Sequence, residues 1–73
     1  MDDERIVLAA YPRAYLLRFR GQFQIVRPKT EDDRQDGINY VALSALHSES
    51  SIAWWYAARK VREEWAEKEG VKP

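Results

Sequence analysis

Several features that define large classes of protein are missing from this sequence. It has no cysteine and a single histidine, so it can form neither disulfides nor thiolate metal sites, and one imidazole does not make a metal cage. Its three glycines are isolated, which leaves no glycine-rich loop for a phosphate group. Its longest apolar run, residues 6–11, is far shorter than the roughly 20 residues that span a bilayer. We therefore expect no metal, no cofactor and no membrane segment.

Size and charge predict one folded domain. The 73 residues cannot hold two hydrophobic cores, so the prediction is a single domain over 1–73, and we expect a monomer. The 12 basic and 12 acidic side chains cancel, which removes the self-repulsion that keeps charged chains unfolded. Acidic residues follow Met1, where a secretory signal would need basic ones. Together with the missing cysteine, this start favours a reducing cytoplasm.

The first element predicted is a short helix over residues 3–10. Asp2, Asp3 and Glu4 suit the positive end of a helix dipole. Pro12 disfavours helical geometry at Tyr11 and so ends the element. Because a helix this short is not stable alone, we expect it to pack on another part of the chain.

The next segment predicts a β-hairpin with strands over 15–20 and 23–27. A two-residue turn at 21–22 would pair Phe19 with Gln24 and spread the rings over both faces. A three-residue loop at 20–22 would pair Phe19 with Phe23 and give one apolar face, and this is the register we expect. The apolar face would consist of Tyr15, Leu17, Phe19, Phe23 and Ile25, and the opposite face of Leu16, Arg18, Arg20, Gln24 and Val26.

The second half of the chain predicts a loop, a strand and a long helix. Pro28 ends the hairpin, residues 28–37 form a polar, mobile loop, and residues 38–43 form a third strand. Ser48 is expected to cap a helix over 49–69, which Gly70 ends. The prediction is an α+β fold of order α-β-β-β-α, with both helices on one face of a three-stranded antiparallel sheet. The helix stripe expected to lie on the sheet consists of Trp54, Ala57, Ala58, Val61 and Trp65.

Charge is unevenly distributed along the chain. Residues 13–29 carry five basic side chains and no acid, and an acidic segment follows at 31–36. Three interpretations of this basic hairpin stay open: an ordinary solvent-facing surface, a contact for an acidic protein, or a contact for nucleic-acid phosphates. The long helix adds Trp55 at the edge of its apolar stripe, beside Arg59, and Tyr56 outside it, and such residues anchor protein interfaces. The residues predicted to bind a partner are Arg13, Arg18, Arg20, Gln24, Val26, Arg27, Trp55, Tyr56 and Arg59.

No constellation typical of an enzyme stands out. His47 lies next to Ser48, but neighbouring positions rarely adopt nucleophile–base geometry, and no third group is evident. The acidic segment lacks the spacing of a calcium loop. The α-β-β-β-α order is shared with double-stranded-RNA-binding domains, yet the stretch 51–55 lacks the lysines with which their last helix grips phosphates. We therefore predict a binding protein without enzymatic activity.

Three stretches carry a resemblance: AAYPRAY at 9–15, GQFQI at 21–25, and Ala53-Trp54 with Ala57-Ala58. This pattern resembles small phage-encoded proteins in which an AAYPxA turn follows a short helix and a capped helix carries AWxxAA. In length and charge the chain is similar to the RNA-polymerase-binding transcription regulators of lytic Xanthomonas phages.

The resemblance implies an activity in the host cytoplasm. Such a protein would bind host RNA polymerase at the start of the β′ subunit and at the β flap. It would keep the sigma factor from directing initiation and let polymerase read through terminators, with nucleic acid as a secondary partner. Two alternatives stay open: a DNA-binding protein that lays its sheet in the major groove, and an inhibitor of another host protein such as a nuclease.

Overall fold

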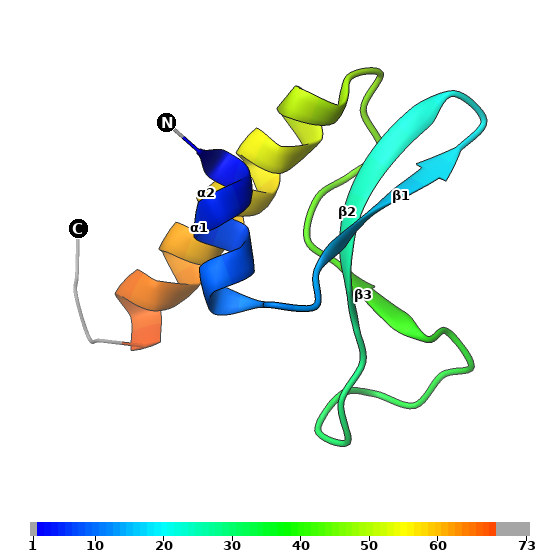
Figure 1. The fold of residues 1–73 in the computed structure, drawn as a ribbon. Helices are drawn as coiled ribbons and strands as arrows, with labels where there is room; N and C mark the ends of the chain where they lie inside the picture. The colour runs from blue at the N-terminus through cyan, green and yellow to red at the C-terminus, as the bar shows by residue number, and fades with distance from the viewer. Residues whose placement is uncertain (1, 69–73) are drawn as a thin grey trace.

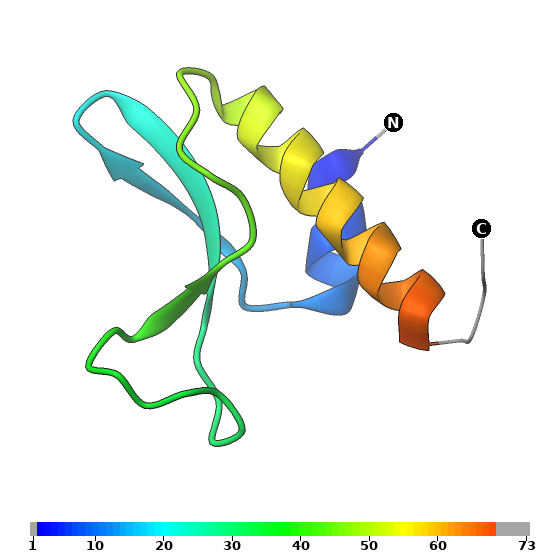
Figure 2. The same cartoon turned by 180° about the vertical axis from the view of Figure 1, so that it is seen from behind.

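The computed structural model describes residues 2–68 and confirms the predicted α+β fold. The chain forms α1 (Asp3–Ala10), β1 (Tyr15–Phe19), β2 (Gln22–Pro28), β3 (Tyr40–Ala42) and α2 (Ser50–Lys68). The strands make one antiparallel sheet in the order β1-β2-β3, with β2 in the centre. Figure 1 and the reverse view in Figure 2 show both helices on one side of this sheet. That side is called the covered face below, and the other the open face.

Helix α1 has the bounds that the sequence predicted. Asp3 and Glu4 occupy its first turn, where acids meet the positive end of the dipole. It ends where the Tyr11 amide donates to the Val7 carbonyl at 2.7 Å, one residue before Pro12. Val7 is fully buried, and α1 packs along α2. A helix of eight residues thus has the packing partner it needs.

The predicted hairpin is present, but both registers drawn from the sequence were wrong. The turn is Arg20-Gly21, so that Phe19 pairs with Gln22 and Leu16 with Ile25. Both turn residues have positive φ, 51° at Arg20 and 76° at Gly21. A turn with two left-handed residues matches the twist of the flanking strands, which explains why the chain accepts an arginine in this conformation.

This register exchanges the two faces of β1. Directly paired residues point to the same side of a sheet, so Leu16 and Arg18 share the covered face with Ile25 and Phe23. The open face carries Tyr15, Leu17 and Phe19 from β1, Gln24 and Val26 from β2, and Tyr40 and Ala42 from β3.

The far edge of β2 is closed by more than the short strand β3. Beyond β3, the Leu43 amide donates to the Ile25 carbonyl at 2.7 Å, and the Ile25 amide donates to the Ser44 hydroxyl at 3.0 Å. Phe23 and His47 then exchange two backbone hydrogen bonds of 2.7 and 2.8 Å. Residues 43–47 therefore follow β2 as an irregular extension of the sheet and lead directly into α2.

Helix α2 supplies half of the buried core cluster, and its buried stripe differs from the predicted one. The stripe includes Ala53, and Trp54 is only partly buried. Trp65, predicted to lie on the sheet, is 44% exposed because the C-terminal half of α2 diverges from the sheet (Figure 2). The helix begins at Ser50, so Ser48 is not its N-cap, and the predicted end at 69–70 lies outside the described residues. The buried core cluster consists of Val7, Ala14, Ile25, Leu43, Ala53, Ala57, Ala58 and Val61.

Within residues 2–68, neither helix has the length and apolar character that crossing a membrane requires.

Candidate functional site

The nine residues predicted to bind a partner separate into three groups in the structure. The first group has internal roles: Arg27 forms an ion pair within the protein, and Gln24 and Val26 contribute to the sheet. The other six remain exposed in two places: Arg13, Arg18 and Arg20 along the hairpin, and Trp55, Tyr56 and Arg59 on α2.

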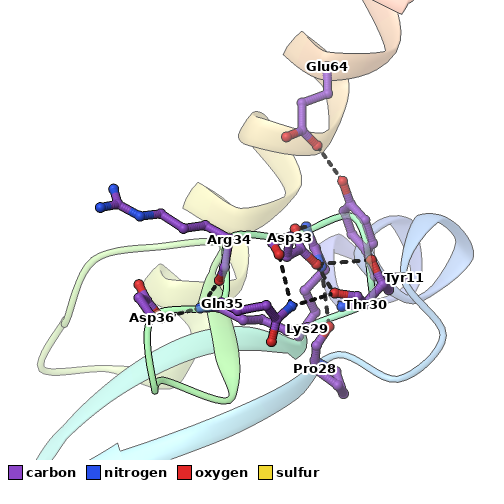
Figure 3. Close-up of polar contacts among 10 residues, drawn as sticks. Tyr11, Pro28, Lys29, Thr30, Asp33, Arg34, Gln35, Asp36 and Glu64 are labelled. Atoms are coloured by element: carbon purple, nitrogen blue, oxygen red, sulfur yellow. Dashed lines mark hydrogen bonds and ion pairs between the residues drawn. The ribbon is translucent and has the colours of Figure 1, made fainter.

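The acidic segment neutralises one end of the basic hairpin. Arg27 donates two hydrogen bonds to the Asp33 carboxylate, at 3.0 and 3.1 Å, and Lys29 pairs with Asp36 (Figure 3). The hydrogen bonds from Arg27 hold the pKa of Asp33 well below its usual range, and Lys29 likewise lowers the pKa of Asp36. Two of the five basic residues between 13 and 29 are therefore unavailable to a partner.

A second contact ties this corner to α2. The Arg27 guanidinium lies 5.1 Å from the centre of the Tyr11 ring, and the Tyr11 hydroxyl donates to Glu64 at 2.7 Å. Figure 3 shows Glu64 reaching down from α2 to this tyrosine. The hydrogen bond to Glu64, followed by burial, raises the pKa of Tyr11. The arrangement joins loop, sheet and helix, and its role is structural.

Gln24 and Val26 also serve the fold. The Gln24 amide nitrogen donates to the Ser44 carbonyl at 3.1 Å, which supports the extension of the sheet. Val26 is 0% exposed although no helix within residues 2–68 covers its face, and it is paired with Tyr15 on one side and with Ala42 on the other. The Val26 side chain therefore does not reach the surface where a partner would bind.

The remaining hairpin arginines are free of acidic partners within residues 2–68. The ion pairs of this part of the chain involve other residues, and Arg13, Arg18 and Arg20 take part in none of them. Arg18 lies 5.5 Å from the centre of the Phe23 ring, and Arg20 lies 5.3 Å from that of Phe19. The positive charge that is free of ion pairs thus lies before β1, on β1 and in the turn, at Arg13, Arg18 and Arg20.

Three aromatic rings contact one another in a row that begins just before α2, continues along the helix and ends at an arginine. The His47 and Tyr56 rings stack, with centres 4.7 Å apart and planes 2° from parallel. Trp55 meets Tyr56 edge to face at 4.8 Å, and the Arg59 guanidinium lies 5.9 Å from the Trp55 ring centre. These four residues, His47, Trp55, Tyr56 and Arg59, are called the aromatic row below.

Sequence reasoning missed one member of this row. It placed Trp55 beside Arg59, as the structure confirms, but considered His47 only together with Ser48 and did not include it among the binding residues. The backbone pairing between His47 and Phe23 holds the imidazole against Tyr56. That pairing continues the sheet beyond its third strand, and no periodic signal marks it in the sequence.

The described residues do not suggest a metal centre, because no group of three or more His, Asp or Glu side chains within 2–68 is placed to hold an ion. Comparison with known proteins adds no functional information: no family model, no curated protein and no solved structure matches the chain.

Proposed function

We propose that this protein is a phage transcription regulator that binds host RNA polymerase and acts by occupancy. Binding at the β′ N-terminal region and the β flap would block sigma-dependent initiation and promote read-through of terminators. The choice of partner comes from the sequence resemblance. The observation that supports a binding role is the aromatic row, in which the side chains of Trp55 and Tyr56 are exposed to solvent.

The aromatic row has the properties of a protein-binding hot spot. Trp, Tyr and Arg are the residues most enriched among those that dominate binding energy. Each ring here contacts the next, so the side chains lose little freedom when a partner covers them. Arg59 already makes an exposed ion pair with Glu63 at 3.4 Å, which a partner carboxylate could replace at small cost.

Occupancy gives a mechanism that needs no chemistry on the part of this protein. A bound protein shifts polymerase between states only to the extent that it binds one of them better than the other. If it binds the surface that sigma needs, polymerase is held in a sigma-free state. Inhibition then saturates near one protein per polymerase, whereas an enzyme would act at substoichiometric amounts.

The test is transcription in vitro from one strong promoter with polymerase from the natural host. Protein added before sigma should inhibit more than protein added to a preformed promoter complex, because bound sigma competes for the surface. Trp55→Ala should weaken polymerase binding at least tenfold, roughly 1.4 kcal/mol. Trp65→Ala is the matched control, since Trp65 lies on the same helix and is 44% exposed against 45% for Trp55.

Three results would contradict the proposal. Absence of inhibition in both orders of addition would exclude polymerase as the target. A promoter shift by the protein alone at physiological salt would favour DNA binding. Equal losses in the Trp55 and Trp65 variants would remove the aromatic row as the contact.

A further inference from the structure

The open face of the sheet is a second surface, separate from the aromatic row. In Figures 1 and 2 both helices lie on the covered side, and within residues 2–68 no helix crosses the other side. Two aromatic rings of β1 point out from this open face: Tyr15 is 42% exposed and Phe19 is 54% exposed. Leu17 lies between them, and the buried Val26 is paired directly with Tyr15.

Two arginines without an ion pair accompany these rings. Arg13 precedes Tyr15, Arg20 lies 5.3 Å from the centre of the Phe19 ring, and neither forms an ion pair within the described part of the chain. The acids of residues 31–36 follow the C-terminal end of β2, the end that pairs with Tyr15, and there Asp33 and Asp36 form ion pairs with Arg27 and Lys29. Each end of β1 therefore combines an exposed ring with an arginine that pairs with no acid of the described residues.

We propose that the open face binds single-stranded nucleic acid along β1, with bases stacked on Tyr15 and Phe19 and phosphates paired with Arg13 and Arg20. Exposed rings on a sheet and a neighbouring line of cations are the two components by which proteins bind single strands. The inference does not depend on polymerase, and it differs from binding a duplex in the major groove.

The spacing of the rings favours a single strand. Four residues along a strand span about 13 Å, whereas successive stacked bases of a duplex strand rise about 3.4 Å. Bases that lie on both Tyr15 and Phe19 must be unstacked from each other. A duplex offers no free base faces to such rings, whereas the unpaired bases of a single strand can stack on them.

The experiment measures fluorescence anisotropy of labelled oligo(U) and oligo(dT) of about 12 nucleotides with the purified protein, and of a duplex of equal length. Phe19→Ala and Tyr15→Ala should each weaken single-strand binding at least fivefold, because stacking on an aromatic ring contributes about 1–3 kcal/mol per base. Tyr56→Ala is the matched control, since Tyr56 and Tyr15 are both 42% exposed and Tyr56 lies on α2.

Salt and fold controls complete the design. Pairing of Arg13 and Arg20 with phosphates predicts a slope of log K against log salt of about −1.4, and Arg20→Gln should reduce it by about half. Circular dichroism melting of each variant checks that the fold is retained. The proposal fails if the single strands do not bind at low salt, if the duplex binds as well as they do, or if Tyr56→Ala weakens binding as much as Phe19→Ala.

Discussion

Ile25 and Val26 are neighbours on the central strand and are both 0% exposed, yet they are buried in different ways. Ile25 lies on the covered face and belongs to the core cluster with Val7 and the alanines of α2. Val26 lies on the open face, outside that cluster, between residues of its own sheet. The covered face is two layers thick, and the open face is a single layer.

The difference shows how a short chain divides its apolar side chains between folding and binding. The covered face uses small residues, Ala53, Ala57 and Ala58, which let α2 approach the sheet closely. The open face keeps larger rings, Tyr15 and Phe19, half in water. A domain of this size buries only about 60% of its surface, so rings left outside its core are available for partners.

The largest effect is expected from a substitution that disrupts the packing of α2 on the covered face of the sheet. Val61→Asp places a carboxylate among fully buried residues and should cost roughly 3–5 kcal/mol, close to the whole stability expected of a small domain. Glu63→Ala, two positions away on the exposed side of the same helix, should hardly change the melting temperature. Thermal unfolding followed by circular dichroism distinguishes the two, and similar melting of both variants would contradict the assigned helix face.

Smaller losses of stability are expected from matched substitutions on the two faces of the sheet. Ile25→Ala should destabilise by about 3 kcal/mol, because it removes methylenes and leaves a cavity between sheet and helices. Val26→Ala should cost about 1.5 kcal/mol, because a single layer open to water can relax around the loss. Urea unfolding of both variants gives the two values. If Val26→Ala cost as much as Ile25→Ala, the open face would be packed as tightly as the covered one.

The smallest expected effect on stability comes from the ion pairs at the end of β2, where Asp33 and Asp36 of the loop meet Arg27 and Lys29. The pKa values of Asp33 and Asp36 are lowered in the folded state, so their stabilisation is complete above the ordinary carboxylate range, about pH 4, and is lost as pH falls below it. The melting temperature should therefore fall modestly below about pH 4. Asp33→Asn should lower it at neutral pH and flatten this acid dependence. An unchanged acid profile in that variant would show that the Arg27 pair does not stabilise the fold.

Local signals in the sequence predicted the elements well, and the contacts between them less well. Helix α1 was predicted to the residue because acids and Pro12 mark its ends. The register of the hairpin was missed because no sequence signal shows that Arg20 adopts a left-handed conformation. Counting apolar residues also favoured a register that places Phe19 opposite Phe23, whereas Phe19 pairs with Gln22. Trp65 fits the period of the buried stripe, but periodicity does not show where a helix leaves its sheet.

The same limit applies to the candidate site. The sequence placed Trp55 and Arg59 together because both lie on one helix at a spacing of four. It could not show that Asp33 and Asp36 fold back on Arg27 and Lys29, since loop closure depends on contacts rather than on pattern. Of the five basic residues within 13–29, Arg27 and Lys29 are held in ion pairs, and the other three remain accessible to a partner.

The placement of the tryptophans has an optical consequence. All three, Trp54, Trp55 and Trp65, lie on α2, and none lies in the sheet. A protein that settles on the aromatic row covers Trp55 and should shift the emission spectrum. A ligand that binds the open face touches no tryptophan and should leave the tryptophan signal almost unchanged. The natural chain therefore carries its own reporter of which of its two surfaces is occupied, and a single titration in a fluorimeter can read it without a label.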